Sequence, residues 1–221
     1  MPAESEVPPR CDLRLIETLG WRAAAGFPRL DRHIARLTRS ADALSFACDP
    51  DAVLAALEDA VVEFRGACAR LRMTLDRDGR VEVTAAVHQD LGPEAEWRAT
   101  IATQRLDPAE PLLAHKTTAR DVYDAARAEA AAMGVEEAIF LNDRGELCEG
   151  GITNIFVEMG DVLLTPALGC GLLPGCLRAE LLASGRACEA VLTTDDLRCA
   201  ERWYLGNSLR GLIPARLVAH N

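Results

Sequence analysis

The first part of the chain changes from a strand-like to a helix-like pattern of apolar positions. Residues 13–19 alternate apolar and polar side chains, which is typical of a half-buried strand. Apolar residues then recur every three or four positions over 30–41, which predicts an amphipathic helix with Asp31 as its N-cap. A second apolar stripe over 50–64 follows Asp49 and a proline, a favourable pair for a helix start.

Three strand-like runs come next. Residues 71–75 and 80–87 flank the sequence Asp-Arg-Asp-Gly at 76–79, which is a hairpin signal, and residues 97–103 form a third run. The first hundred residues therefore predict a small α+β unit that contains all three strands.

The pattern restarts after residues 106–111, whose two prolines disfavour both helix and sheet pairing. An alanine-rich helix is predicted over 118–133, ending at Gly134. The later predicted elements are strands at 138–141, 152–157, 162–165 and 202–205, a turn at 142–145, and a helix from the glycine-flanked turn 171–175 to 182. We expect an N-terminal domain over 1–105, a linker over 106–111 and a larger domain over 112–221.

Composition limits the classes of partner. The chain has 221 residues, is 49% hydrophobic and carries a formal net charge of −10, with dispersed arginines. This charge argues against nucleic acid and anionic membranes, which require a clustered positive surface. No apolar run is long enough to span a membrane, and the acidic start over 1–6 does not resemble a signal peptide. We expect a cytoplasmic protein that acts on a small molecule.

Cysteine and histidine spacing gives no metal-binding motif. The eight cysteines include no C-x-x-C pair, and the four histidines are scattered. We therefore expect reduced, structural thiols and no bound metal.

Lys116 and Glu149 are the residues that point to specific chemistry. A lysine amine can form an imine with a carbonyl cofactor, and a buried carboxylate can keep a pyridine nitrogen protonated so that the ring accepts electrons. Glu149 opens a strand-like run that begins Glu-Gly-Gly-Ile-Thr-Asn, 33 positions after the lysine. The pair is what pyridoxal chemistry requires.

Three further features could bind a phosphate. Residues 171–178 form a glycine-flanked turn into a predicted helix, whose first amides are anion donors. The loop 206–208 adds amide and hydroxyl donors, and Arg36 on the first predicted helix adds a fixed positive charge.

Taken in order, these residues resemble the class IV aminotransferase family of pyridoxal phosphate enzymes. That family includes D-amino acid and branched-chain aminotransferases as well as aminodeoxychorismate lyase, and the resemblance covers about residues 13 to 218. It is carried by Ile16-Glu17-Thr18-Leu19, His33-x-x-Arg36-Leu37-x-x-Ser40-Ala41, Lys116, Glu149-Gly-Gly-Ile-Thr-Asn154-Ile-Phe, Leu173-Pro174-Gly175 with Arg178, and Gly206-Asn207-Ser208. It implies two α/β domains with pyridoxal 5'-phosphate in the cleft between them, and a homodimer.

The resemblance also implies roles for individual residues. Lys116 would be the Schiff-base lysine and proton carrier, Glu149 would pair with the pyridine nitrogen, and Arg36 would bind the phosphate. The remaining residues expected to bind the cofactor are Asn154, Leu173 on the ring, and Cys176, Leu177, Asn207 and Ser208 at the phosphate.

The chain departs from the family pattern at several positions. Leu177 stands where many members have a phosphate-binding threonine, so only its amide could serve. Asp121 stands where members often have a tyrosine that contacts the cofactor, and Tyr123 lies two positions later. Tyr123 could contact the cofactor or pack in the core. The chain also begins close to its first predicted strand, whereas most relatives have about thirty residues before it.

The short start and the versions of the motifs around Lys116 and residues 206–211 favour one activity within the family. The resemblance implies a lyase that converts 4-amino-4-deoxychorismate to 4-aminobenzoate and pyruvate in folate biosynthesis. Arg210 and Arg105 are candidates for the substrate carboxylates, although each could equally form a surface ion pair. The alternatives are an aminotransferase for branched-chain or D-amino acids, and a partner subunit that has lost catalysis.

Overall fold

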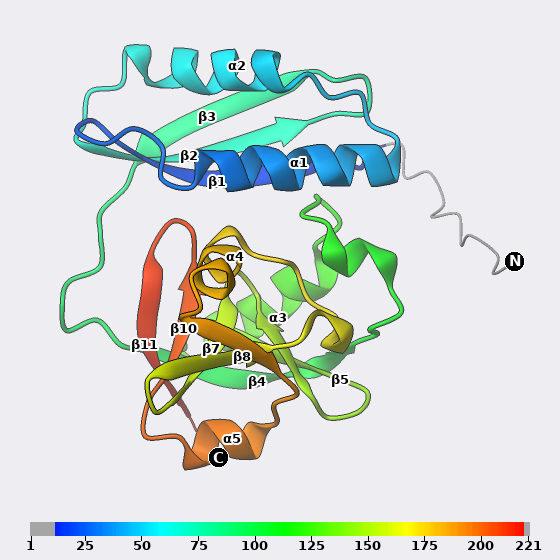
Figure 1. Ribbon diagram of the computed structural model, residues 1–221, viewed down its shortest axis with the longest axis vertical. Helices are drawn as coiled ribbons and strands as arrows, with labels where there is room; N and C mark the ends of the chain where they lie inside the picture. Colours follow the sequence, from blue (N-terminus) through cyan, green and yellow to red (C-terminus); the bar gives the residue numbers. More distant parts are fainter. Residues whose placement is uncertain (1–11, 219–221) are drawn as a thin grey trace, which may run out of the picture.

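Two separate β-sheets organise the chain (Figure 1). The computed structural model describes residues 12–218. The acidic start over 1–6, Cys11 and His220 lie outside the described residues. One sheet has three strands and the other has eight, and each has its own helices (Figure 1).

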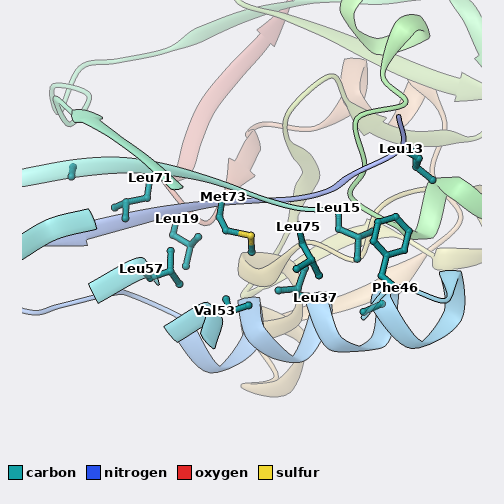
Figure 2. Packing of buried hydrophobic residues seen from close by; sticks show 12 residues of the cluster. Leu13, Leu15, Leu19, Leu37, Phe46, Val53, Leu57, Leu71, Met73 and Leu75 are labelled. Atoms are coloured by element: carbon teal, nitrogen blue, oxygen red, sulfur yellow. The ribbon is translucent and has the colours of Figure 1, made fainter. Parts of the chain in front are cut away.

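The three-stranded sheet is antiparallel in the order β1-β2-β3. Its strands and the two helices that pack on it are β1 (Leu15–Arg22), α1 (Leu30–Leu44), α2 (Pro50–Val62), β2 (Cys68–Leu75) and β3 (Val81–Val87). Leucines at alternate positions of β1 and β2 meet the apolar faces of both helices in one core, where Leu19 and Leu71 are fully buried (Figure 2). The predicted alternation and the predicted hairpin are therefore both confirmed.

The two helices begin differently. Asp49 caps α2 as predicted, because its side chain accepts from the Asp51 amide at 3.0 Å and Pro50 is the first helical residue. The helix predicted over 30–41 is confirmed as α1, but its predicted N-cap is wrong. Its N-cap is Arg29, which adopts the left-handed conformation, and Asp31 lies inside the first turn. There the carboxylate interacts favourably with the helix dipole without capping an amide.

The eight-stranded sheet has the order β6-β5-β4-β11-β10-β7-β8-β9. Its strands are β4 (Trp97–Leu106), β5 (Glu137–Asn142), β6 (Leu147–Gly150), β7 (Asn154–Met159), β8 (Val162–Pro166), β9 (Ala187–Ala190), β10 (Trp203–Asn207) and β11 (Gly211–Leu217). The helices of this part are η1 (Pro111–Ala114), α3 (Asp121–Ala132), η2 (Leu168–Cys170), α4 (Cys176–Ala183) and α5 (Thr194–Cys199). The helix predicted over 118–133 is thus present as the shorter α3, and the helix predicted to follow the 171–175 turn and end at 182 is present as α4, which ends one residue later.

The expected place of residues 97–103 is wrong. They lie in β4, which pairs in parallel with β5 and β11 of the larger sheet and with no strand of the smaller one. The two sheets therefore divide the chain between β3 and β4, before the proline-containing segment 106–111. The partners of a parallel strand are distant in sequence, so local patterns do not reveal them.

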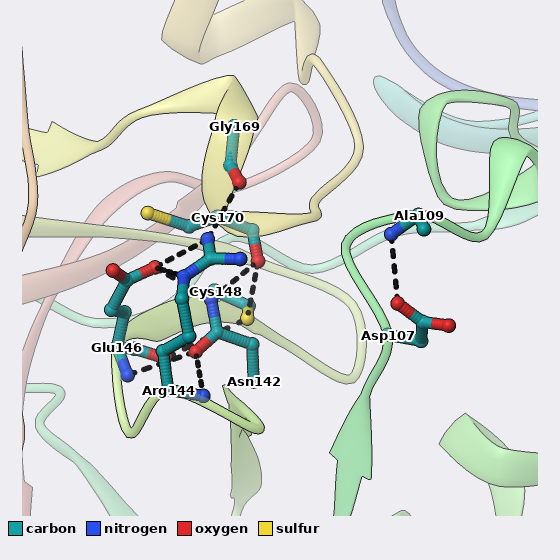
Figure 3. A network of polar contacts seen from close by, with 8 residues as sticks. All are labelled: Asp107, Ala109, Asn142, Arg144, Glu146, Cys148, Gly169 and Cys170. Carbon is teal, nitrogen blue, oxygen red and sulfur yellow. Dashed lines mark hydrogen bonds and ion pairs between the residues drawn. The ribbon is translucent and has the colours of Figure 1, made fainter.

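The predicted turn at 142–145 is held by a polar network that also ties down the following strand (Figure 3). The Asn142 side-chain oxygen accepts from the amides of Arg144 and Glu146, both at 3.0 Å, while its nitrogen donates to the Cys170 carbonyl. Arg144 donates to Glu146 and to the Gly169 carbonyl. The network fixes the start of β6, the strand that carries Glu149.

No helix within residues 12–218 is long and apolar enough to cross a membrane.

Replacement of a core leucine should test the smaller sheet. Leu71→Ala should lower the free energy of unfolding by about 2–5 kcal/mol, because it removes buried methylene groups and leaves a cavity. Urea denaturation followed by circular dichroism measures this change. Val62, which is 73% exposed at the end of α2, is the matched control: Val62→Ala should change stability by no more than about 0.5 kcal/mol. Equal losses in the two variants would contradict this account of the core.

Candidate active site

A cavity of about 660 Å³ is lined by residues from both parts of the fold. Thr18 and Arg70 come from strands of the smaller sheet, and the other lining residues come mainly from the larger part. It collects eleven of the predicted site residues: Arg36, Arg105, Lys116, Tyr123, Glu149, Asn154, Leu173, Cys176, Asn207, Ser208 and Arg210. Leu177 does not line it. Its side chain is buried beside Phe156 and Leu181.

Lys116 is the only lysine in the sequence. Its backbone carbonyl accepts from the Ile16 amide at 2.8 Å, and Thr118 bonds twice to the backbone of Arg14, so this segment is fixed to the start of β1. Burial and the charges of Arg36 and Arg120 lower the pKa of Lys116 to about 8. A substantial fraction of the amine is therefore neutral near physiological pH, as a nucleophilic lysine requires.

Glu149 lies on β6 and is buried. Burial raises its pKa to about 7, even though hydrogen bonds from Tyr123 and the Leu173 amide oppose the shift. The Tyr123 hydroxyl donates to the Glu149 Oε1 atom at 2.8 Å. A buried carboxylate that accepts from one side-chain donor can accept a further hydrogen bond from a protonated group of a ligand.

Tyr123 combines packing with a polar contact. Its ring meets the edge of Phe140, with centroids 5.0 Å apart, and the Arg120 guanidinium lies 5.0 Å from the ring centroid. Because its hydroxyl donates to Glu149, Tyr123 holds the carboxylate in place. These contacts support the packing interpretation of Tyr123, whereas its contact with a cofactor stays a prediction.

Sequence reasoning gave no role to Glu17 or His33, which form the polar centre beside the cavity. Glu17 accepts from Arg36 at 2.8 and 2.6 Å and from His33 Nδ1 at 2.6 Å. The other ring nitrogen of His33 lies 2.7 Å from the Ser208 hydroxyl. Glu17 occupies the apolar side of β1 between Leu15 and Leu19, and a charge at such a position was the available signal.

Burial alone would raise the pKa of Glu17, but the Arg36 guanidinium and the His33 hydrogen bond outweigh it and hold the pKa at about 2. Glu17 in turn raises the pKa of Arg36, so both groups stay charged. The third nitrogen of Arg36 donates to the Pro174 carbonyl at 3.4 Å. Arg36 thus reaches the turn that begins α4.

The turn before α4 leaves no room for a side chain at its last glycine. A Cβ on Gly175, the N-cap of α4, would stand 2.0 Å from the Asn154 side-chain oxygen. Asn154 also donates to the Leu173 carbonyl at 3.0 Å. Asn154 therefore packs against this turn and holds it by a hydrogen bond. Cys176 follows as the first residue of the helix.

The Asn207 side chain stabilises its own loop through hydrogen bonds. Its side-chain oxygen accepts from the amides of Leu209 and Arg210, at 3.1 and 3.0 Å, and its nitrogen donates to the Ile152 carbonyl at 3.2 Å. The side chain is engaged within the protein, so any contact with a ligand would come from the rest of the loop, above all from Ser208.

Glu137 was also missed by sequence reasoning. It is fully buried at the start of β5 and accepts from the amides of Gly151 and Ile152 and from the Thr153 hydroxyl, at 3.1, 3.1 and 2.9 Å. These bonds fix the glycine turn that directly follows Glu149. Its place as the first residue of an apolar strand gave no sign of this function.

The two arginines predicted for substrate carboxylates both line the cavity. Arg105 donates to the Ala102 carbonyl at 2.8 Å, and the Arg210 guanidinium lies 5.5 Å from the Trp97 ring centroid. Neither forms an ion pair with a carboxylate within the described residues, in contrast to the surface pairs such as Arg14–Glu82.

One trio within residues 12–218 has metal-ligand atoms close together: Glu17, His33 and Cys176, within 4.8 Å of one another. The carboxylate already pairs with the Arg36 guanidinium. A cation would meet that positive charge, so we interpret the trio as part of the ion-pair network.

Comparison with known proteins is consistent with this geometry. The family model described as "Amino-transferase class IV" matches residues 14–218. The chain belongs to the class IV aminotransferase family. The expected two-part α/β fold is the one shared by the solved structures of this family.

The relatives carry two kinds of name. A Schizosaccharomyces pombe protein provisionally named aminodeoxychorismate lyase is 28% identical over 86% of this chain and 84% of its own length. A Mesorhizobium loti crystal structure, provisionally assigned as an amino-acid aminotransferase, is 47% identical with a TM-score of 0.90, covering 94% of this chain and all of its own. A Methanocaldococcus jannaschii protein provisionally named branched-chain-amino-acid aminotransferase is 30% identical over 56% of this chain and 45% of its own length.

Class IV enzymes use pyridoxal phosphate, and the family includes both lyases and aminotransferases. The residues around the cavity fit that group. They supply a partly neutral amine at Lys116, a buried carboxylate at Glu149, and a guanidinium and hydroxyl at Arg36 and Ser208. Gly175 and Cys176, at the start of α4, also line the cavity.

Removal of the Glu17 charge should be strongly destabilising. Glu17→Gln leaves the buried Arg36 guanidinium without its carboxylate and should lower the free energy of unfolding by about 3–5 kcal/mol at pH 7. Because the folded pKa of Glu17 lies below its ordinary value of 4.5, its stabilisation is complete above pH 4.5 and is lost as the pH falls through about 2. The gap between wild type and variant should therefore narrow below pH 4.5 in urea titrations. A gap independent of pH would show that the ion pair is not its cause.

Proposed function

We propose that this protein is a pyridoxal phosphate-dependent lyase that converts 4-amino-4-deoxychorismate to 4-aminobenzoate and pyruvate. The observation that carries the proposal is that the sole lysine and the buried Glu149 line one cavity, with pKa values of about 8 and about 7. The similarity to the Schizosaccharomyces pombe protein over most of both chains supports the choice of the lyase reaction.

The residues that would hold the cofactor follow from their chemistry. Lys116 would bind its aldehyde carbon, Glu149 its ring nitrogen, and Arg36 its phosphate, with Ser208 and the first amides of α4. When bound, pyridoxal phosphate supplies an electron sink next to the carbon that carries the substrate amine.

Proton transfer would fall to Lys116. Once the substrate amine takes its place on the aldehyde carbon, Lys116 would be a free, neutral amine able to remove the proton from the amine-bearing carbon of the substrate. Breaking the carbon–oxygen bond would then release the enolate of pyruvate, which takes up a proton on its CH2 carbon to give pyruvate, and the substrate ring would become aromatic. Glu149, held by the Tyr123 hydroxyl, stabilises the positive charge on the ring nitrogen throughout.

A second candidate function is amino-group transfer between an amino acid and a 2-oxo acid. It is favoured by the Mesorhizobium loti structure, whose provisional name is that of an amino-acid aminotransferase. Such an enzyme would use the same Lys116 and Glu149 but would depend strictly on a 2-oxo acid.

We also propose that the protein works as a homodimer, as the family resemblance implies. Sedimentation can test this proposal.

Cofactor uptake should depend on pH through Lys116. Only the neutral amine attacks an aldehyde, so uptake by the apoprotein should accelerate as the pH rises through about 8 and level off above it, since the pKa is lowered from 10.5. Stopped-flow absorbance measures the rate. Borohydride reduction followed by peptide mass spectrometry should place the label on Lys116, and Lys116→Ala should take up no label there. A rate that continues to rise up to pH 10 would contradict the lowered pKa.

Product analysis separates the two functions. The holoenzyme given 4-amino-4-deoxychorismate should release equal amounts of pyruvate and 4-aminobenzoate without any amino acceptor. Lys116→Ala should lose at least about a thousandfold in kcat, since both covalent attachment and proton transfer depend on this residue. A strict requirement for a 2-oxo acid would refute the lyase proposal and support the aminotransferase.

A further inference from the structure

Three arginines from distant parts of the chain converge on the cavity without forming an ion pair. Arg70 lies on β2, Arg127 on α3 and Arg210 in the turn between β10 and β11, and all three line the cavity. Most arginines of the described chain pair with a carboxylate, such as Arg22 with Asp90 and Arg98 with Glu136. Within residues 12–218 these three do not.

The three charges are close enough to oppose one another. Burial lowers the pKa of Arg210, and the charges of Arg70 and Arg127 lower it further. Glu137 opposes this shift in Arg210 and also interacts with the Arg127 charge, but it already accepts hydrogen bonds from the glycine turn. A group of like charges with one shared, occupied carboxylate is stabilised by an added anion.

Two of the three side chains are held in place, as a binding site requires. The Arg127 stem packs against Gly151, where a Cβ would stand 2.5 Å from its Cγ atom, and its Nε is buried without a hydrogen-bond partner. Arg210 lies over the Trp97 ring. Ordered guanidinium groups form paired hydrogen bonds with a carboxylate and lose little freedom on binding.

The other cavity arginines are already engaged. Arg120 donates to the Gly151 carbonyl at 2.6 Å and pairs with Asp124, Arg105 donates to a backbone carbonyl, and Arg36 pairs with Glu17. Within residues 12–218, the cavity arginines whose side chains have no ion-pair or hydrogen-bond partner are Arg70, Arg127 and Arg210, and they are separate from Arg36, the residue proposed for the phosphate.

We propose that Arg70, Arg127 and Arg210 bind one carboxylate of the substrate and make the enzyme selective for substrates that carry it. The inference rests on the proposed function in that the amine of the same substrate is placed at Lys116. The substrate proposed above has two carboxylates, one on its ring and one on its enolpyruvyl group, and either can be the one bound.

Ligand binding to the holoenzyme tests the site without turnover. Isothermal calorimetry would compare 4-aminobenzoate with its neutral isostere 4-aminobenzamide, pyruvate with pyruvamide, and glutarate with glutaramate. The acid of at least one pair should bind about ten- to a hundredfold more tightly than its amide, as expected for charge-assisted hydrogen bonds. The 4-aminobenzoate and pyruvate pairs distinguish the ring carboxylate from the enolpyruvyl carboxylate.

Charge-removing variants then assign the preference to residues. Arg127→Gln and Arg210→Gln should abolish it, whereas Arg127→Lys should restore part of it. Arg70→Gln, at an exposed side chain, should weaken it without affecting folding. Arg216→Gln removes the same charge from an exposed pair with Glu96 and should leave the preference intact. In turnover assays the three cavity variants should raise KM with little change in kcat.

Several outcomes are decisive. The proposal is wrong if no acid binds better than its amide, or if the cavity variants lose no more of the preference than Arg216→Gln does. It is also wrong if these variants change only the sedimentation of the protein, because the arginines would then serve a subunit contact. A retained preference for glutarate over glutaramate in an enzyme with no lyase activity would refute the proposed function but would still support the carboxylate site.

Discussion

The buried ion pair between Glu17 and Arg36 is the interaction on which the cavity depends. Taking two charges out of water is costly, and the cost is offset only when every remaining donor and acceptor is satisfied. Here β1 supplies the carboxylate and α1 supplies both Arg36 and His33. His33 then reaches Ser208, and Arg36 reaches the Pro174 carbonyl, so the need to satisfy one ion pair joins the smaller sheet to two loops of the larger part.

The same principle sets the geometry around Glu149. Its carboxylate is buried and needs donors, which Tyr123 and the Leu173 amide provide. The glycine turn that follows is held by Glu137, whose oxygens accept from successive amides. The Glu17 carboxylate holds Arg36, and the Tyr123 hydroxyl holds Glu149. Neither supporting group needs to contact a substrate itself. Removal of such a support would therefore displace the site without deleting any residue that reacts.

Local patterns predicted those elements whose signals are local. The alternation over 13–19, the Asp49–Pro50 helix start and the turn at 142–145 were correct because each depends on nearby residues. The strand at 97–103 was assigned to the wrong sheet because its parallel partners are distant in sequence. The strands β6, β9 and β11 were not predicted. β6 and β9 have four residues each, which leaves little periodicity to detect, and β11 begins at Gly211 and contains Pro214, two residue types that disfavour a strand prediction. At the site, the family motifs named the cavity residues, whereas Glu17 and Glu137 have roles that depend on burial. The sequence contains a single lysine, and this fact alone would have marked Lys116 as the candidate for covalent attachment of a cofactor.

The lowered pKa of Lys116 and the raised pKa of Glu149 have one cause, which links the fold to the chemistry. Burial disfavours the charged form of both groups, so the amine and the carboxyl each move toward neutrality. A cationic ring nitrogen beside Glu149 would reverse one shift, because an opposite charge favours the carboxylate. The amine would stay partly neutral, since Arg36 and Arg120 continue to oppose its protonation. Binding of a pyridine cofactor would thus charge one end of the cavity and leave the base at the other end free to take a proton.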